Sequence, residues 1–411
     1  MRNHQPVPES DMDWASPDNT ICETIRRAYH TIKKYDEQDL HGSTLMAQAM
    51  LDLRIATAMA KSMSAKLTEY NRKWSNGFYE NNQSFPKKRH SKMLDVLFLC
   101  WDDNANTGYK FLQCARYLGL NAVMFKGKPH PFNYPNQAPV LPQLSSPPIA
   151  GAPITVMAPG IEPLINSAHV VHLIASTYPM AAVDWKKTNV VVQHGGTAYR
   201  QNPEDCNHIF NQMANKTIVQ TPDLMGLGAN NESLILFPVD TDKIQPDFRQ
   251  KGDDLIVGHF PSNPDVKGSF EIEQVLQGVD GIKLVIDYHR LPWEDNLKRM
   301  AKCDIIIDGC SPEQNGKPYG AFGNQTLEAA ALGCSVITHC VNEGDYGWEY
   351  GDLVPHVSNT PEELRDYVKA VAGDLEWIQK HKERCREWVE KCHSIPATAN
   401  RLYDKVYKDF F

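Results

Sequence analysis

The sequence predicts an α/β protein built from two Rossmann-like, doubly wound domains that face each other across a cleft, with a helical extension at the N-terminus. Three observations support this fold class. Apolar runs typical of buried parallel strands alternate with helical segments from residue 93 onward. The same alternation restarts near Asp254. The first 90 residues, in contrast, show only helical periodicity.

The N-terminal extension, residues 1–90, is expected to form a helical hairpin. The letters TICE at residues 20–23 match a capping box, and an apolar stripe at helical spacing runs from Ser43 to Arg72. The hairpin docks either on the body of the protein or on another subunit, where it makes a homodimer. The apolar stripe is compatible with both alternatives.

The first Rossmann-like domain is expected at residues 91–243. It begins with the apolar run LDVLFLC at residues 94–100, which a polar turn at 101–108 connects to a helix at 109–118. Further strands are predicted at residues 121–125, 170–174, 189–193, 216–220 and 233–237. Between Gly127 and Pro153 the chain is so rich in proline that neither strand nor helix is expected. This loop either covers an acceptor site or is an insertion with no role in the chemistry.

The second Rossmann-like domain is expected at residues 244–390. Its predicted strands are residues 255–259, 283–287, 304–308 and 335–338, and its helices include residues 293–302 and 326–332. Residues 391–411 are expected to form a C-terminal helix that packs back toward the N-terminal domain. In open α/β sheets, ligands bind at the carboxyl ends of the strands, so the cleft between the two sheets is the expected site.

The composition narrows the functional classes. The chain of 411 residues is 42% hydrophobic and 22% charged, which is typical of a soluble globular protein. No apolar run approaches the roughly 20 residues of a membrane span, and the polar first residues do not resemble a signal peptide, so a cytoplasmic location is expected. The ten cysteines form no CxxC pair and several lie in apolar runs, which favours reduced thiols. The formal charge of −8 argues against general attraction to nucleic acid, and the basic residues 87–92 are interpreted as a solvated linker.

The segment GAFGNQTLEAAALGCSVITH at residues 320–339 carries the strongest functional signal. A glycine-containing loop leads into a short helix, which ends at Gly333 before an apolar strand. This order places free backbone amides and the carboxylate of Glu328 together at the edge of a sheet. Such an arrangement suits a phosphorylated, hydroxyl-rich ligand.

Five segments in order resemble GT-B-fold retaining glycosyltransferases of the glycogen-synthase-like and mannosyltransferase-like superfamily. The segments are VVHL at 170–173, VVVQHGGT at 190–197, LFPVDTD at 236–242, VGHFPSNPDVKG at 257–268 and AFGNQTLEAAALG at 321–333. Each is a weak signal alone, but five in the correct order are specific. The resemblance covers residues 93–390 and leaves out the N-terminal extension, which looks loosely like helical leaders of phage proteins.

The resemblance implies a catalytic set of His194, Lys267 and Glu328. In it, Lys267 meets the diphosphate, Glu328 accepts hydrogen bonds from the ribose hydroxyls, and His194 lies near the sugar carbon at which transfer occurs. Each residue also has a non-functional interpretation. Lys267 could be an exposed lysine in a turn, Glu328 an ordinary glutamate on a helix surface, and His194 a buried histidine with a structural role. The expected donor-binding residues are the amides of Phe322, Gly323 and Asn324, together with His259, Ser262, Asn263, Arg290 and Glu313. The expected acceptor-side residues are Asn106, Gly195, Gly196 and Thr197.

Two departures from the family pattern affect the donor site. Gly320 stands where the family often carries an acidic residue that helps to hold the donor sugar, and Glu313 in the preceding loop is one candidate to replace it. His259 stands where the family carries an arginine. A histidine there is a weaker cation that titrates near neutral pH. Donor identity and catalysis both depend on these positions.

The first functional hypothesis is a retaining, metal-independent glycosyltransferase that uses a nucleotide-sugar and no cofactor. Metal independence is expected because the chain has no Asp-x-Asp motif in a suitable loop. Asp102-Asp103 and the pair Asp240 and Asp242 resemble such a motif in their letters alone. One alternative keeps the fold but makes the protein a sugar-nucleotide epimerase or a non-catalytic sugar-nucleotide-binding protein. Another makes the acceptor a modified base in phage-type DNA, with the protein in the host cytoplasm; its signature is steeply salt-dependent DNA binding.

Overall fold

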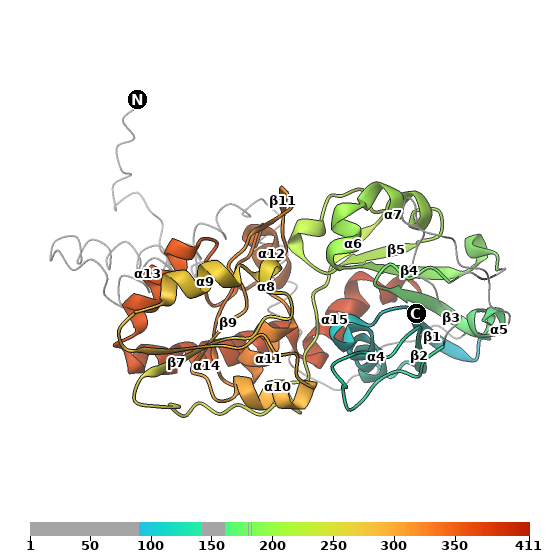
Figure 1. Ribbon diagram of the computed structural model, residues 1–411. Helices are drawn as coiled ribbons and strands as arrows, with labels where there is room; N and C mark the ends of the chain where they lie inside the picture. The colour runs from blue at the N-terminus through green and yellow to red at the C-terminus, as the bar shows by residue number, and fades with distance from the viewer. Residues whose placement is uncertain (1–89, 142–160, 180, 182) are drawn as a thin grey trace, which may run out of the picture.

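The computed structural model describes residues 90–141, 161–179, 181 and 183–411 (Figure 1). The helices expected in residues 1–89 and the second part of the proline-rich loop lie outside these described residues. The part of that loop from Gly127 to Leu141 contains neither helix nor strand, apart from a single bridge between Lys126 and Val140. No helix in the described residues is long and apolar enough to cross a lipid bilayer.

The first domain is built on a six-stranded parallel sheet. Its spatial order is β2-β1-β3-β4-β5-β6, and the strands are β1 (Leu94–Cys100), β2 (Ala122–Lys126), β3 (Ala168–Ile174), β4 (Asn189–His194), β5 (Lys216–Val219) and β6 (Glu232–Leu234). The apolar runs of these strands are buried because helices and loops cover both faces of the sheet. The helices of this domain are α4 (Thr107–Tyr117), α5 (Glu162–Ser167), α6 (Gly196–Gln201) and α7 (Pro203–Phe210).

The second domain is built on a four-stranded parallel sheet in the order β12-β9-β7-β8. Its strands are β7 (Leu255–His259), β8 (Ile282–Ile286), β9 (Ile305–Ile307) and β12 (Ser335–Ile337). The helices that accompany them are α8 (Pro264–Lys267), α9 (Ser269–Leu276), α10 (Trp293–Met300), α11 (Asn324–Ala331), α12 (Glu343–Tyr350) and α13 (Pro361–Val371). The predicted α/β class with two Rossmann-like domains is therefore confirmed.

A small hairpin interrupts the second domain where only a loop is expected. It consists of β10 (Glu313–Gln314) and β11 (Lys317–Pro318), joined by a turn in which Asn315 and Gly316 both have positive φ. An Asn-Gly pair favours this tight turn because both residues tolerate the left-handed backbone conformation. The hairpin lies directly before the segment that begins at Gly320.

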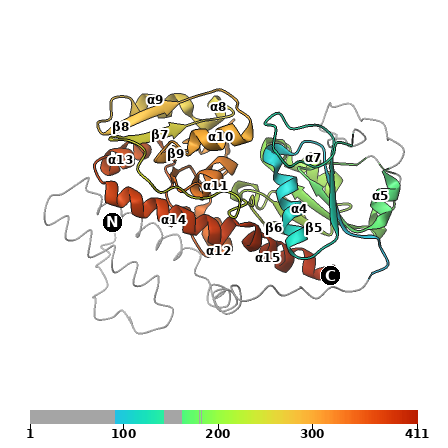
Figure 2. The same ribbon diagram turned by 90° about the horizontal axis from the view of Figure 1, so that it is seen from below.

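The chain ends by crossing back to the first domain. Helix α14 (Leu375–His393) runs along the second domain, and α15 (Ile395–Lys405) packs against α4 of the first (Figure 2). The break between them is set by Ser394, whose hydroxyl accepts a hydrogen bond from the Ala397 amide at the start of α15. The apolar residues of this last segment join the core of the first domain; they are Ala399, Leu402, Val406, Tyr407 and Phe411.

Arg386 on α14 fastens the linker between the two domains. Its guanidinium, which is 9% exposed, donates to the carbonyls of Ile244 at 2.7 Å and Thr241 at 2.8 Å. It also donates to the carbonyl of Ala331 at 2.6 Å, at the end of α11. One side chain thus joins the linker, α11 and α14.

We expect the substitution Arg386→Lys to lower the free energy of unfolding by about 2–4 kcal/mol, because lysine cannot reach all three buried carbonyls and an unpaired buried carbonyl is costly. Urea unfolding followed by circular dichroism measures this loss. Arg365→Lys on the exposed face of α13 is the matched control and should change stability by less than about 0.5 kcal/mol. Equal stability of Arg386→Lys and the wild type would contradict the role given to Arg386.

Candidate functional site between the domains

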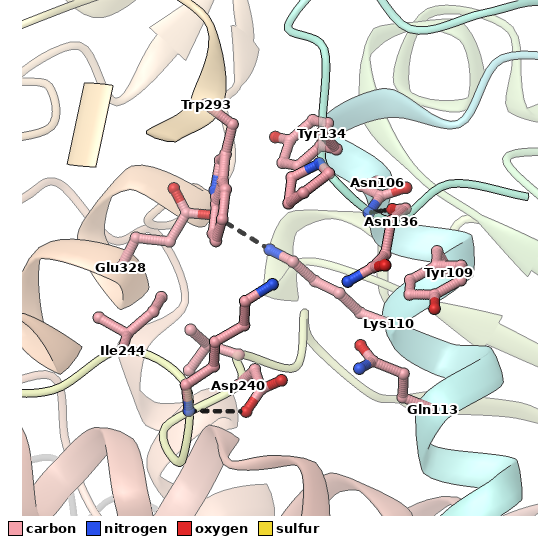
Figure 3. A pocket seen from close by; sticks show the side chains of 13 residues that line it. Asn106, Tyr109, Lys110, Gln113, Tyr134, Asn136, Asp240, Ile244, Trp293 and Glu328 are labelled. Carbon is pink, nitrogen blue, oxygen red and sulfur yellow. Dashed lines mark hydrogen bonds and ion pairs between the residues drawn. The ribbon is translucent and has the colours of Figure 1, made fainter. Parts of the chain in front are cut away.

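A small pocket with a cavity volume of about 40 Å³ lies between the two domains (Figure 3). The first domain contributes residues from α4 and the loop after β2, the linker contributes a third side, and α10 and α11 of the second domain close it. The side chains that line the pocket include Asn106, Lys110, Tyr134, Lys243, Trp293 and Glu328.

The carboxylate of Glu328 is the centre of this pocket. It is buried one turn into α11, and its Oε1 accepts hydrogen bonds from Lys110 Nζ at 3.2 Å and from Trp293 Nε1 at 2.9 Å. The lysine comes from α4 of the first domain and also donates to Asn324 Oδ1 at 2.8 Å. The predicted ribose-binding carboxylate thus faces the cleft, where a cation from the opposite domain holds it.

Aromatic rings form one wall of the pocket. The rings of Tyr134 and Trp293 lie 5.7 Å apart at 36°, and the Trp293 amide donates to the carbonyl of Phe132 at 2.8 Å. Burial, and then the neighbouring carboxylates, raise the pKa of Tyr134 far above its usual range. Its hydroxyl therefore stays protonated, and the wall offers flat apolar surface with a polar edge.

The turn before α4 holds strained backbone at the pocket. Ala105 and Asn106 both adopt the left-handed conformation, with φ of 53° and 55°. Left-handed non-glycine residues cost roughly 1–3 kcal/mol each and persist only where the surroundings impose them. Here Asp103 imposes the turn, because its carboxylate accepts from the amides of Gly108 at 2.6 Å and Tyr109 at 3.3 Å.

This turn positions Asn106, which was expected on the acceptor side. Its Nδ2 donates to the carbonyl of Asn136 at 2.8 Å, whereas its Oδ1 is buried without a hydrogen-bond partner. Asn106 lines the pocket. A buried acceptor without a donor is suited to a ligand hydroxyl or amide.

The start of α11 meets a lysine and a carboxylate at the carboxyl end of β9. Lys267 Nζ donates to Asp308 Oδ2 at 3.0 Å, and the Gly323 amide donates to the same oxygen at 2.8 Å. Two of the predicted diphosphate-binding groups are therefore close together, as expected. The sequence analysis did not single out Asp308, although a charged residue directly after a buried strand is the available signal.

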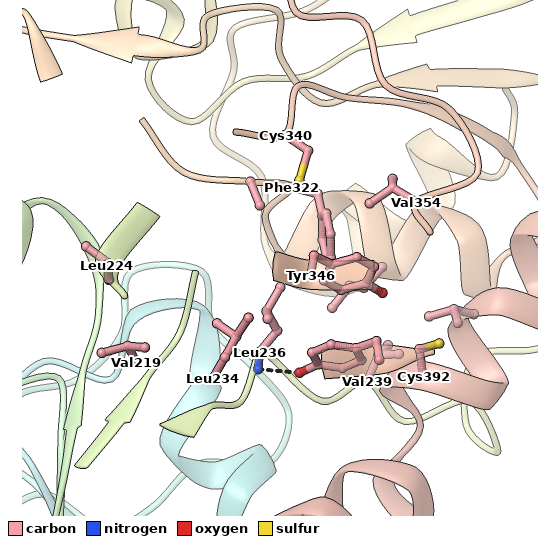
Figure 4. Packing of buried hydrophobic residues seen from close by; sticks show 14 of the residues in the cluster. Val219, Leu224, Leu234, Leu236, Val239, Phe322, Cys340, Tyr346, Val354 and Cys392 are labelled. Atoms are coloured by element: carbon pink, nitrogen blue, oxygen red, sulfur yellow. Dashed lines mark hydrogen bonds between the residues drawn. The ribbon is translucent and has the colours of Figure 1, made fainter. Parts of the chain in front are cut away.

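Other predicted donor residues divide into a buried and an exposed group. The ring of Phe322 is in the core, where it packs edge-on against Tyr346 at 5.4 Å (Figure 4). His259 is fully buried, with Nδ1 against the carbonyl of Ile307 at 2.8 Å and Nε2 against the hydroxyl of Ser269 at 2.7 Å. Burial lowers the pKa of His259 to about 4, so it is neutral at pH 7 and supplies no charge to a donor.

The exposed group lies at the outer end of the second domain's cleft edge. Ser262, Asn263 and Arg290 are exposed, and Arg290 Nη2 donates to the carbonyl of Ser262 at 3.1 Å, which ties two loops together. Glu313 is exposed on the β10–β11 hairpin.

His194 ends β4 and points into the first domain. Its Nδ1 pairs with the hydroxyl of Ser176 at 2.7 Å, its ring stacks on Tyr199 at 4.0 Å, and its Nε2 is buried without a partner. Burial lowers the pKa of His194 to about 3, so the imidazole is neutral at pH 7. A Cβ on Gly195 would lie 1.9 Å from Gln220 Oε1, so a larger residue there requires the Gln220 side chain to move, while Gly196 and Thr197 are exposed.

Gly320, the position without the expected acid, lies beside a cation from the opposite domain. A Cβ built on Gly320 would be 3.8 Å from Arg200 Nη2. Arg200 is buried against Asp223 at 2.5 Å, and its guanidinium lies 4.8 Å from the ring centre of Tyr319. Arg200 is therefore balanced by Asp223, and the pair adds no net charge near Gly320.

Sequence reasoning missed Lys110, Trp293, Asp103, Asp308 and Arg200. One signal was available for Lys110: a lysine in the first turn of a helix opposes the helix dipole, so it needs a partner elsewhere. Trp293 at the start of α10 and Arg200 in α6 carry no comparable signal, because their partners come from distant parts of the chain.

Comparisons with known proteins support the fold and do not identify the protein. No protein-family model and no curated protein matches the sequence. Solved structures of Anabaena HepE (Alr3699) in complex with UDP and glucose, and in complex with UDP-glucose, each match with a TM-score of 0.53 at 12% identity, over 77% of this chain and 100% of that chain. The same protein in complex with UDP matches with a TM-score of 0.50. The likeness shows a shared two-domain fold and agrees with the predicted GT-B arrangement.

Asp103 gives this site a predicted pH dependence. Burial, its largest influence, raises the pKa of Asp103 to about 6. A carboxyl whose pKa is raised on folding stabilises the protein below its unfolded pKa of about 4, and this stabilisation is lost as the pH rises through about 6. We expect the stability of the wild type relative to Asp103→Asn to fall by about 3 kcal/mol between pH 4 and pH 7. Urea unfolding across that range measures the difference, and parallel pH curves would contradict it.

Proposed function

We propose that the protein is a glycosyltransferase that binds a nucleotide-sugar in the cleft between its domains, with a UDP-sugar as the first candidate. One observation carries the proposal: Glu328, Gly323 and Gly320 follow one another along α11 and the loop before it. Glu328 contacts Lys110 of the first domain, Gly323 lies beside Lys267, and Gly320 lies beside Arg200 of the first domain. Their order matches ribose, diphosphate and sugar. HepE, which shares the fold, was solved with UDP-glucose.

The nucleoside is assigned to the pocket of Figure 3, which must widen to admit it because the unliganded cavity of about 40 Å³ is smaller than a nucleoside. Glu328 is placed to accept from the ribose hydroxyls once Lys110 turns toward the incoming ligand, and the rings of Trp293 and Tyr134 offer surface for a planar base. The two lysines that line the pocket, Lys110 and Lys243, are balanced by Glu328 and Asp240, so the lining has no net charge, which suits an uncharged nucleoside.

The diphosphate is assigned to the start of α11. As the glycosidic bond lengthens, negative charge accumulates on the departing nucleoside diphosphate and must be stabilised. Lys267, which in the unliganded protein is paired with Asp308, is the cation assigned to the diphosphate, and the amides of the first helical turn supply neutral donors aligned with the helix dipole.

The donor sugar is assigned to the neighbourhood of Gly320, beside Arg200 and Tyr319. His194 is fully buried in the first domain, with Nδ1 against Ser176 and its ring on Tyr199, so in this proposal it supports the end of β4 and makes no contact with the sugar. Retention of the anomeric configuration is part of the proposal and rests on the motif resemblance alone. The acceptor would approach from the first domain, past Asn106.

We expect the purified protein to hydrolyse one nucleotide-sugar slowly in the absence of acceptor, with release of the nucleoside diphosphate. Lys267→Met and Glu328→Gln should each reduce this release at least tenfold, because they remove charge from the diphosphate and ribose positions. Coupled detection of free UDP measures the rate, and melting curves confirm that each variant is folded.

The matched controls are Lys298→Met and Glu376→Gln, which break exposed ion pairs on α10 and α14. They should leave the rate unchanged. Absence of both release and binding for every donor tested would remove the glycosyltransferase proposal. Conversion of the sugar to its epimer without an acceptor would instead assign the protein to the epimerases.

Metal independence is a separate part of the proposal. Within the described ranges, no three His, Cys, Asp or Glu side chains gather closely enough to hold a metal ion, and the proposal gives the stabilisation of the diphosphate to Lys267 and the amides at the start of α11. We expect donor hydrolysis to continue unchanged in EDTA. Loss of activity in EDTA and its return with Mg²⁺ or Mn²⁺ would contradict this part.

A further inference from the structure

Asp308 occupies the position that the proposed function gives to the diphosphate. Its carboxylate is 3% exposed, and one oxygen accepts from both Lys267 Nζ at 3.0 Å and the Gly323 amide at 2.8 Å. A Cβ on Gly323 would lie 3.4 Å from this oxygen and 3.6 Å from Lys267 Nζ. The three groups are in contact, so no phosphate oxygen fits between them while Asp308 is in place.

Both members of the pair are charged at neutral pH. Burial acts to lower the pKa of Lys267, but Asp308 and Tyr319 beside it outweigh burial and raise it. Burial likewise acts to raise the pKa of Asp308, but Lys267 and the Gly323 amide outweigh burial and lower it. Lys267 and Asp308 together are electrically neutral, and an incoming diphosphate would meet a fixed negative charge at its own binding position.

A second buried aspartate, Asp304 at the opposite end of β9, has a structural role and serves as a comparison for Asp308. Asp304, directly before β9, is fully buried and accepts from Lys382 Nζ at 2.7 Å and from the amides of Lys251 at 3.2 Å and Ile256 at 3.0 Å. All these partners belong to the second domain's own framework. Asp308 differs in two ways. It directly follows β9 at the carboxyl edge of the sheet, where ligands bind in such sheets. Its partners, Lys267 and the Gly323 amide, are donors of the kind that bind an anion.

We propose that Asp308 is an internal substitute for the anionic group of the ligand, which a diphosphate must displace from Lys267 and Gly323 in order to bind. The inference rests on the proposed function for the identity of the ligand, a nucleoside diphosphate ester. In the unliganded protein Asp308 keeps Lys267 and the Gly323 amide paired. Affinity for the donor is lower by the free energy needed to break this contact.

The competing role for Asp308 is positioning. If Asp308 holds Lys267 in the orientation that phosphate requires, its removal weakens phosphate binding. If it is a substitute for phosphate, its removal strengthens binding. The two roles predict opposite signs for the same substitution.

The test compares the wild type with Asp308→Asn by isothermal titration calorimetry at constant pH and ionic strength, using the full chain. Inorganic pyrophosphate and UDP are the two probes. We expect Asp308→Asn to bind both at least tenfold more tightly than the wild type. Asp304→Asn is the matched control on the same strand: it should lower the melting temperature and leave both affinities unchanged.

Unchanged or weaker binding of pyrophosphate by Asp308→Asn would overturn the inference, and so would a failure of both proteins to bind it. Asp308→Ser provides a second neutral variant if the asparagine variant does not fold, as judged by its melting curve, and the same affinities decide the outcome. Tight UDP binding that Asp308→Asn weakens would overturn the inference and leave the proposed function intact. A gain for pyrophosphate with UDP bound no better than pyrophosphate would support the inference and contradict the nucleotide assignment.

Discussion

The close packing of α11 between the second sheet and α14 is the constraint on which the rest of the structure depends. Ala329, Ala330 and Ala331 are fully buried, and these small side chains allow α14 to approach the helix. The approach places the start of α11 at the carboxyl end of β9 and turns Glu328 toward the first domain. It also brings Arg386 to the linker. The same few contacts therefore set both the site and the position of the domains.

Most of the fold was accessible from the sequence because its signals are local. An apolar run such as Leu94–Cys100 can be buried on both faces only in a parallel sheet, and the observed strand has these same bounds. The final strand of the first sheet was less well predicted: residues 233–237 were expected, whereas the strand is Glu232–Leu234 and the apolar residues after it belong to the linker. Burial in a core and burial in a linker leave the same pattern in a sequence.

The site was only partly accessible, because its charges are paired across long distances in the chain. The motifs indicated Lys267 at the end of α8, Gly323 directly before α11 and Glu328 within α11. Nothing near Lys110 in the sequence indicates that it reaches Glu328, more than two hundred positions later. The histidines show the opposite case. The spacing at His259 suggested a ligand contact, whereas both of its nitrogens bond within the domain. A local pattern indicates which residues are close to a sheet edge and cannot indicate which partner each one takes.

The return of α15 to the first domain has a consequence for synthesis of the chain. Residues 399–411 complete a core whose other members, on β1 and α4, leave the ribosome some three hundred residues earlier. Until residues 399–411 are synthesised, that face of the first domain has no cover from them, and its apolar surface is exposed in the nascent chain. Domains that wait for a distant segment are open to aggregation in this interval, so the protein is expected to depend on chaperones during synthesis more than its compact final form suggests.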